Sequence, residues 1–382
     1  MHDTINHGAK KMISAIIAQQ FDIEGYLVSV EPLGSGNVND TYIAIFRTVF
    51  DEHKVVIQRI NKTVFTKPEE LMQNMHLVTE HAHQRLREEH DDAERIWQLP
   101  KVIPSKSGKD FIIDEDGEYW RAITRIASAH SYDAVQNINH ALEIGSVLGN
   151  FHHIISDIPC DQLFDTLPGF HITPEYFKKL DDALATKAGK ARLQSSQVAK
   201  NVMKFIELRR EWSSFLEDAK AKGEVELRPI HGDPKTTNVM IDDATSKGTA
   251  IIDLDTVKPG LILYDIGDCL RSCCNPAGEE CTDFTKIYFD VDFCFALLNG
   301  YQQHSKGLLS DFDKAHIYDA ARLITYELAL RFFADYLAGD VYFKTKYDGQ
   351  NLHRARVQVQ LCRSIEANES KIRRTLELLF KQ

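Results

Sequence analysis

The stretch from residue 230 to residue 255 constrains this chain more than any other part of its sequence. It reads IHGDPKTTNVMIDDATSKGTAIIDLD and combines a tight turn, a short apolar run and polar side chains at fixed spacing. Asp233 lies in the turn, Asn238 follows five residues later, and Asp253 comes directly after the apolar run 250–252. A carboxylate on a turn can accept a proton from a hydroxyl, while an amide oxygen and a second carboxylate are hard ligands suited to Mg²⁺. The pattern therefore predicts a catalytic loop next to a metal site.

A purely structural interpretation of the same stretch is available. Two strands, 238–241 and 249–253, joined by a polar hairpin loop would leave acidic residues at the strand ends without a chemical role. Any single carboxylate here fits that interpretation. The complete set fits better the loop H-x-D-x-x-x-x-N of phosphoryl-transfer enzymes, with His231 before the aspartate and Asn238 after it.

Composition and charge exclude several classes of function. The chain has 382 residues, and its 45 Lys and Arg against 56 Asp and Glu give a net charge of −11. This acidic balance argues against nucleic acid or an anionic membrane as a partner, although ATP needs only a local cationic pocket and a metal. The seven cysteines are odd in number and mostly scattered, and no run approaches the ~20 apolar residues of a membrane span. We therefore expect a cytoplasmic protein that acts on small molecules.

A glycine-rich segment lies between two segments that are rich in β-branched and aromatic residues, 26–33 and 41–46. It includes Gly34, Ser35 and Gly36. Because glycine has no side chain, such a hairpin lets backbone N–H groups approach phosphate oxygens. An ordinary hairpin turn explains the same residues, but their position ahead of the 230–255 stretch favours a nucleotide-binding loop.

The apolar run 55–57 predicts a strand that should present a cation to the nucleotide phosphates. The usual lysine is absent: Gln58 takes its place by hydrophobic register, and Arg59 follows it. Neighbouring strand residues face opposite sides, so only one of the two can point towards a nucleotide. We favour Arg59 because the task requires charge, and Gln58 as a hydrogen-bond donor stays open.

A long helix is predicted to begin at Thr66, since Thr66 can cap it, Pro68 suits its first turn and Glu69 follows three residues after the cap. If the chain resembles phosphoryl-transfer enzymes here as well, an acidic residue on this helix should orient the phosphate-binding cation. Glu80 is the best-spaced candidate and Glu70 the alternative. A solvated surface position explains either residue equally simply.

In this order the motifs resemble the aminoglycoside phosphotransferase and choline kinase-like family, and above all its sugar 1-kinase branch, over roughly residues 26–345. The resemblance implies an α+β, bilobal, protein-kinase-like fold with an antiparallel sheet and a helix in a small N-terminal lobe, and a larger, mainly helical C-terminal lobe. Composition changes from strand-rich to helix-rich near Ala127. We therefore expect a nucleotide-binding lobe at 1–127 and a catalytic and acceptor-binding lobe at 128–382.

The resemblance also implies roles for residues whose pattern alone leaves them undecided. Asp265 would anchor the catalytic loop through backbone N–H groups, while His231 and Asp255 would support the site. Acceptor-binding roles fall on residues from both ends of the chain, namely Asn39, Asp40, Asp268, Arg271, Arg331, Tyr342 and Phe343. For Asp268, stabilisation of a helix N-terminus explains the residue about equally well.

These expectations combine into a small-molecule kinase that uses ATP and Mg²⁺. The sugar 1-kinase resemblance implies transfer to the C1 hydroxyl of a hexose or N-acetylhexosamine, with Asp233 as the base. Gly232 after His231 is more typical of the aminoglycoside and choline kinases, so an aminoglycoside, choline or amino-alcohol acceptor is the alternative. The unusual residues at strand positions 58 and 59 also allow a catalytically inactive nucleotide-binding regulator.

Overall fold

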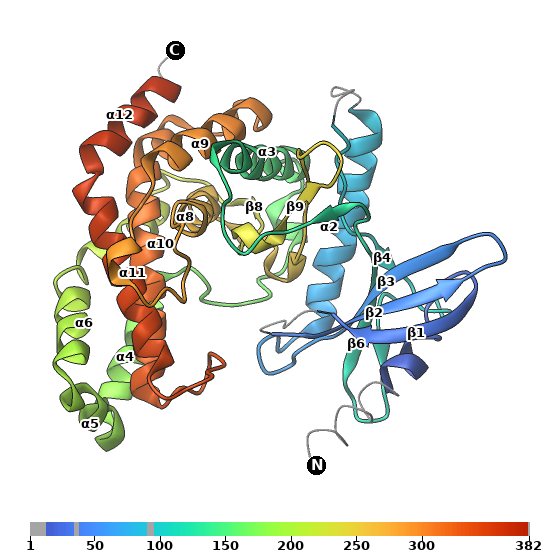
Figure 1. The fold of residues 1–382 in the computed structure, drawn as a ribbon, viewed down its shortest axis with the longest axis horizontal. Helices are drawn as coiled ribbons and strands as arrows, with labels where there is room; N and C mark the ends of the chain where they lie inside the picture. The colour runs from blue at the N-terminus through green and yellow to red at the C-terminus, as the bar shows by residue number, and fades with distance from the viewer. Residues whose placement is uncertain (1–12, 34–37, 90–94, 381–382) are drawn as a thin grey trace. The chain divides into compact units, whose positions relative to one another are not determined.

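The computed structural model describes residues 13–33, 38–89 and 95–380 (Figure 1). The chain forms two compact units. Unit 1 comprises Met1–Ser128 together with Asp161–Leu167, and unit 2 comprises Ala129–Cys160 together with Pro168–Gln382. The segment 161–167 therefore returns to unit 1, which a single division after Ala127 does not include.

Unit 1 is built on an antiparallel sheet whose main path runs β1-β2-β3-β6-β4. Its strands are β1 Tyr26–Pro32, β2 Asp40–Arg47, β3 Glu52–Arg59, β4 Val102–Ile103, β5 Ile112–Ile113 (paired with β6) and β6 Tyr119–Thr124. One face packs against Ile17 and Phe21 from the N-terminal helical segment, where residues 13–18 are helical. Val55 and Ile57 of β3 are buried on this face, whereas Val56 between them is only partly buried. This alternation is expected of a strand with one fully covered face.

Helix α2, Pro68–Glu88, follows β3. Pro68 occupies the start of the helix, but Lys67 precedes it and no described side chain caps it. The predicted cap at Thr66 was wrong, because proline already sets the backbone angle of the first turn and has no N–H to satisfy there. The buried side of α2 carries apolar residues at helical spacing, among them Leu71, Met75 and Val78.

Short strands frame the stretch 230–255, the predicted catalytic loop, in unit 2. They are β7 Ala129–His130, β8 Arg228–Ile230, β9 Val239–Asp242, β10 Gly248–Ile251 and β11 Lys258–Gly260, with β8 paired to β11 and β9 between β7 and β10. Asn238 ends the 3-10 turn η3, Thr236–Asn238, and Asp253 lies beyond β10. The expected strands 238–241 and 249–253 are thus shifted, and the two polar residues flank the hairpin.

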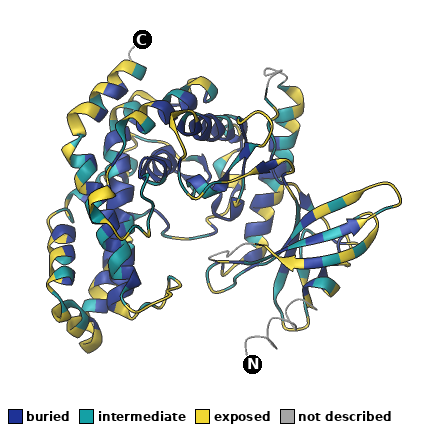
Figure 2. Cartoon of the chain, in the orientation of Figure 1, coloured by how far each residue is buried: buried dark blue, intermediate teal, exposed yellow. Residues whose placement is uncertain are grey.

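The rest of unit 2 is mainly helical. Its helices are α3 Ile138–Ile155, α4 Thr173–Ala185, α5 Lys187–Ser195, α6 Gln197–Glu207, α7 Phe215–Ala221, α8 Ile262–Cys273, α9 Val291–His304, α10 Asp311–Ala338, α11 Gln350–Ala367 and α12 Glu369–Phe380. Almost every residue of α8 is buried (Figure 2). One final helix over 352–380 was expected, but Asn368 ends α11 by donating its Nδ2 to the Ser364 carbonyl at 2.9 Å.

Helices α3 and α9 lie side by side (Figure 1) because glycines allow their backbones to approach closely. A Cβ on Gly145 would lie 1.8 Å from the Leu297 carbonyl oxygen, and one on Gly300 would lie 2.0 Å from that of Leu142. Any larger residue would force these helices apart. No helix in the described part of the chain combines the length and apolarity that crossing a membrane requires.

Candidate active site

Asp265 of α8 anchors the turn 231–233, which we call the catalytic turn after its predicted role. Its Oδ2 accepts a hydrogen bond from the His231 backbone N–H at 2.6 Å, and its Oδ1 accepts one from Gly232 at 2.8 Å. His152 Nε2 of α3 lies 2.8 Å from Oδ2, and the Tyr301 hydroxyl of α9 lies 2.9 Å from His152 Nδ1. Burial alone would raise the pKa of Asp265, but His152 and the backbone donors lower it overall. Side chains from three helices, α3, α8 and α9, therefore fix the turn through one carboxylate.

The turn itself requires glycine at position 232. Gly232 has a φ of +87°, and a Cβ there would lie 2.6 Å from the Thr256 carbonyl oxygen. His231 Nδ1 accepts the Asp233 backbone N–H at 3.2 Å, and its Nε2 lies 3.0 Å from the Ile252 carbonyl. These partners fit a neutral ring with its proton on Nε2, in keeping with burial, which lowers the pKa of His231.

Asp233 carries a partly exposed carboxylate, with 27% of its side-chain surface accessible. It pairs with the Lys235 ammonium. Asn238 Nδ2 donates to Asp233 Oδ2 at 3.3 Å and to the Asp233 carbonyl at 2.8 Å. Burial acts to raise the pKa of Asp233, but Lys235 and His231 lower it below its usual range. Asp233 is therefore ionised at neutral pH, as a proton acceptor must be.

The ammonium group of Lys235 interacts electrostatically with three carboxylates. Burial acts to lower its pKa, but Asp233, Asp253 and Asp268 together raise it above the ordinary value. The positive charge of Lys235 therefore reduces the repulsion between these three carboxylates. Sequence reasoning did not select Lys235, although its place two residues after Asp233 was a readable signal.

Asp253 adopts a left-handed backbone conformation, with φ of +67°. The preceding residue, Ile252, donates its N–H to the Asn238 carbonyl at 2.8 Å, so Asp253 follows a backbone contact with the catalytic loop. Asp255, two residues further on, is buried in the 3-10 turn η4, Leu254–Thr256. The structure thus brings Asn238 and Asp253, the predicted metal ligands, to the same loop region of unit 2.

Asp268 and Arg271 form a buried ion pair on α8. Arg271 Nε donates to Asp268 Oδ1 at 2.8 Å, and the guanidinium also binds Glu279. Burial raises the pKa of Asp268 despite Arg271, and the nearby charge of Asp233 adds to the rise. Within the described residues, the buried Oδ2 of Asp268 has no hydrogen-bond partner.

His171 joins the catalytic turn to α10. Its Nε2 lies 2.7 Å from the Gly232 carbonyl, and its Nδ1 lies 3.1 Å from Glu327 Oε1. Thr173 donates its hydroxyl to Glu327 Oε2 at 2.7 Å. Burial acts to lower the pKa of His171, but Glu327 raises it overall. Sequence reasoning missed this pairing, because its members lie far apart in the chain.

The guanidinium of Arg331 lies among aromatic rings of unit 2. Its Cζ is 5.0 Å from the ring centroid of Phe170, 5.1 Å from that of Tyr176 and 5.6 Å from that of Phe343. Glu327 Oε1 is 3.9 Å from its Nη1. Among the described residues, none accepts a hydrogen bond from this guanidinium within the usual distance. Arg331 is therefore held by the faces of aromatic rings and by one long ion pair. Its N–H groups donate no hydrogen bond to another described residue.

The segment after α10 lies next to Arg331. Tyr342 is half-exposed, and its ring stands edge-on to Phe343 at 4.8 Å. Asp335 accepts three successive backbone N–H groups of this segment, from residue 341 to residue 343, at 3.0, 2.8 and 3.0 Å. Burial acts to lower the pKa of Arg331, yet several charges, including that of Asp233, raise it overall. The structure thus brings Arg331, Tyr342 and Phe343 together in the unit that holds Asp233.

The sequence-predicted residues of unit 1 make local contacts. Gly34, Ser35 and Gly36 lie outside the described residues. Asn39 Oδ1 accepts the Asn61 backbone N–H at 3.0 Å, and Asp40 Oδ2 accepts Arg59 Nε at 3.1 Å. Both side chains predicted to reach the acceptor therefore have partners within unit 1.

Glu80 does not contact Arg59, against our expectation for the predicted nucleotide site. It pairs with Lys101 at 3.1 Å, and the alternative candidate Glu70 pairs with Lys67 at 2.8 Å. Each acid has a nearer cation on its own surface. Arg59 in turn already carries carboxylate partners, so neither acid is required to orient it.

No cluster of three or more His, Cys, Asp or Glu side chains in the described ranges could hold a metal alone. A metal bound by Asn238 and Asp253 would therefore complete its shell with substrate oxygens and water.

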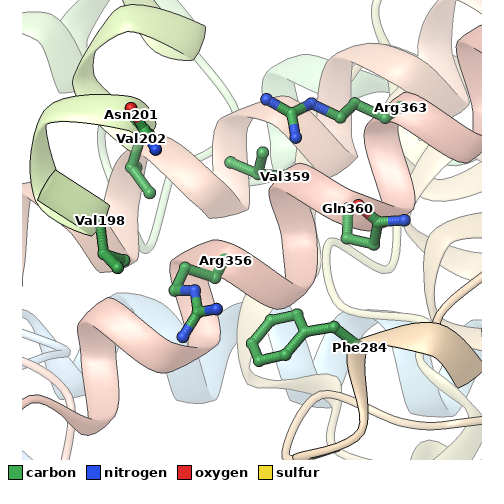
Figure 3. A pocket seen from close by; sticks show the side chains of 8 residues that line it. All are labelled: Val198, Asn201, Val202, Phe284, Arg356, Val359, Gln360 and Arg363. Atoms are coloured by element: carbon green, nitrogen blue, oxygen red, sulfur yellow. The ribbon is translucent and has the colours of Figure 1, made fainter.

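A separate cavity of about 250 Å³ lies between α6 and α11 (Figure 3). Arg356 and Phe284 line it on one side and Val202 on the other, and none of its lining residues belongs to the candidate active site.

Comparison with known families identifies the chain. The model of the phosphotransferase enzyme family matches residues 29–293, which is more than half of the sequence. The chain belongs to this family. It is accordingly a phosphotransferase.

Solved structures agree with this phosphotransferase in fold. An aminoglycoside phosphotransferase from Alicyclobacillus acidocaldarius subsp. acidocaldarius DSM 446 is 13% identical with a TM-score of 0.61, covering 95% of this chain and 96% of that chain. A choline kinase from Cryptosporidium parvum Iowa II is 13% identical with a TM-score of 0.57, covering 97% and 100%. Spectinomycin phosphotransferase in complex with ADP and spectinomycin is 12% identical with a TM-score of 0.52, covering 94% and 98%. The predicted α+β, kinase-like fold is confirmed, with the antiparallel sheet in unit 1 and mostly helices in unit 2.

Proposed function

We propose that this phosphotransferase transfers the γ-phosphate of ATP to a hydroxyl of an uncharged sugar, the C1 hydroxyl of a hexose or N-acetylhexosamine. Asp233 orients the acceptor hydroxyl and takes its proton, since it is ionised and partly exposed on a rigid turn. The choice of C1 rests on the sequence resemblance to sugar 1-kinases. The choice of an uncharged acceptor rests on Arg331.

The observation that carries the proposal is the position of the Arg331 guanidinium against three aromatic rings. Quaternary ammonium groups are typically bound by aromatic faces of this kind. Here the protein's own cation already lies against them, which would repel a cationic acceptor. The unspent N–H donors of Arg331 suit hydroxyl and carbonyl oxygens, and the half-exposed ring of Tyr342 offers a stacking face for a sugar.

Asn238 and Asp253 fit a Mg²⁺ ion by chemistry and by placement. The Nδ2 of Asn238 is used on Asp233, which leaves its Oδ1 as the ligand atom, and Asp253 contributes a carboxylate. The Lys235 ammonium among the same carboxylates indicates that this region stabilises positive charge. When bound, Mg²⁺ would neutralise charge on the phosphate oxygens.

The test is ATP turnover with the full-length protein across a panel of hexoses, N-acetylhexosamines, amino alcohols and aminoglycosides. We expect turnover with free hexoses or N-acetylhexosamines, and we expect the product to lack the reducing end. Arg331→Gln should raise KM for the sugar without changing KM for ATP. Turnover confined to choline, ethanolamine or an aminoglycoside would overturn the sugar assignment.

One observation favours an amino-alcohol or aminoglycoside acceptor as the second candidate. The buried Oδ2 of Asp268 has no hydrogen-bond partner among the described residues, and Asp233 is close enough to influence its pKa. An acceptor ammonium would satisfy that oxygen. The same panel distinguishes the two candidates, because Asp268→Asn should then affect only cationic acceptors.

A further inference from the structure

Strand β3 lacks the lysine that would be expected to bind the nucleotide phosphates in unit 1. Nucleotide phosphates require a positive charge near the sheet. The strand that should carry it, β3, ends in Gln58 and Arg59. The contacts of each residue decide which of them can serve.

Arg59 is poorly suited to bind phosphate. It pairs in register with Trp120, whose side chain belongs to the core cluster, so Arg59 lies on the sheet face covered by the N-terminal helical segment. Its Nε donates to Asp40 at 3.1 Å, and its Nη1 lies 3.4 Å from Glu118. Two carboxylates therefore neutralise its charge, and our preference for Arg59 as the phosphate ligand does not fit these contacts.

Gln58 points to the opposite face and is tied to a buried arginine. Its direct cross-strand neighbours are Thr41 on β2 and Arg121 on β6. Gln58 Oε1 accepts two hydrogen bonds from Arg121, from Nε at 2.9 Å and from Nη2 at 2.7 Å, while Gln58 Nε2 donates to Thr41 Oγ1 at 3.1 Å. The amide is thereby fixed with one Nε2 hydrogen remaining to be donated.

Arg121 supplies a charge that this amide does not cancel. The residue is 1% exposed, and its guanidinium group brings a positive charge to the amide. The two charge-assisted bonds to Oε1 polarise the amide and strengthen its remaining N–H as a donor. The next row of the same face is apolar and only partly buried, with Ile43, Val56 and Ile123. A planar base could pack on that row while its phosphates reach Gln58.

We propose that Arg121 replaces the missing strand lysine by acting through Gln58: Gln58 contacts the nucleotide phosphates, and Arg121 positions its amide and supplies the charge. This inference rests on the proposed use of ATP. It makes Arg121 a positioning residue and Gln58 the residue that touches the nucleotide.

The test compares ADP with adenosine in calorimetric binding to the full-length protein. Gln58→Glu keeps the hydrogen bonds to Arg121 but cancels its charge, so it should lower ADP affinity by about tenfold or more. Adenosine affinity should change less than about twofold, because adenosine lacks phosphates. A merely structural role would weaken both ligands together.

A second set of variants moves the positive charge from position 121 to position 58. Arg121→Gln alone should weaken ADP binding, and Gln58→Lys combined with Arg121→Gln should return most of the lost affinity by placing a cation on β3. Arg59→Gln is the matched control and should leave ADP affinity unchanged. Folding of every variant is followed by thermal unfolding.

The outcomes separate this inference from the proposed function. If folded Gln58→Glu keeps wild-type ADP affinity, or if Arg59→Gln loses as much affinity as Gln58→Glu, the role of Arg121 is overturned while ATP use stands. If the wild-type protein binds neither ATP nor ADP, the proposed function fails first.

Discussion

Asp233 is the residue on which the proposed chemistry depends, because it combines partial exposure with an anchored turn and a lowered pKa. Lys235 and Asn238 both contact its Oδ2. These contacts keep the carboxylate oriented before any acceptor arrives. The cost of losing its basicity should therefore appear in turnover and not in folding.

Asp233→Asn is expected to lower kcat by about 10² or more, the scale of general-base catalysis, while ADP affinity stays near the wild-type value. Steady-state kinetics and calorimetry measure the two effects. Asp243→Asn is the control, since Asp243 lies in an exposed hairpin and, among the described residues, pairs with His130 alone. Unchanged kcat in Asp233→Asn would remove Asp233 as the base.

The His171–Glu327 pair gives a pH-dependent contribution to stability. Burial opposes both charges, yet the pair lowers the pKa of Glu327 below 4.5 and raises that of His171 above 6.5. The Glu327 contribution is present above pH 4.5 and is lost as pH falls through its folded pKa. The His171 contribution is present below pH 6.5 and is lost as pH rises through its folded pKa.

Glu327→Gln should therefore lower the free energy of unfolding most between about pH 4.5 and pH 6.5, with a smaller difference on either side. Gln keeps an acceptor for the Thr173 hydroxyl, so the comparison isolates the charge. Urea unfolding at a series of pH values measures it. A difference that is constant from pH 4 to pH 8 would contradict the ion pair.

At the scale of elements, the turn that contains Gly232 depends on glycine more strongly than the turn that contains Gly223. Gly232 and Gly223 both have positive φ, of +87° and +72°. A Cβ at Gly232 meets the Thr256 carbonyl oxygen, whereas nothing lies within 4 Å of a Cβ at Gly223. The two positions separate backbone strain from steric overlap.

Gly223→Ala should lower the free energy of unfolding by about 1–2 kcal/mol, the cost of a left-handed conformation for alanine. Gly232→Ala should lower it by about 3 kcal/mol or more, because overlap adds to that strain, and it should also reduce kcat. Chemical unfolding monitored by circular dichroism compares the two. Equal losses would mean that the Thr256 carbonyl moves away freely.

Local patterns in the sequence could be interpreted, but contacts between distant segments could not. The spacing of Asp233 and Asn238 is set within one turn, so it can be recognised without knowing the rest of the fold. The Gln58–Arg121 contact joins residues 63 positions apart and depends on strand register, which composition does not fix. For the same reason the favoured Arg59 proved to be paired with carboxylates, and His171 went unrecognised.

At the scale of the whole molecule, the fold class was implied by the family that the motifs, in their order along the chain, resemble. The exact ends of elements did not follow, as the shifted cap of α2 and the break at Asn368 illustrate. Such ends depend on tertiary contacts as much as on local propensity. The return of segment 161–167 to unit 1 has no local signal either.

Turnover should require a divalent metal. EDTA is expected to abolish activity and Mg²⁺ to restore it, since Asn238 and Asp253 would hold a metal that offsets the charge of the phosphates. Asn238→Ala and Asp253→Asn should each raise the Mg²⁺ concentration for half-maximal activity by about tenfold or more. Asp243→Asn should not. Full activity in EDTA would exclude the metal role of both residues.

Arg331 has a consequence for how acceptor preference can change. Its guanidinium occupies the space between the aromatic rings of Phe170, Tyr176 and Phe343. A shorter side chain at position 331 would leave this space between the rings open without altering the catalytic turn. If the proposed role of Arg331 holds, a site for neutral polyols and a site for cationic alcohols would differ at this position by one residue.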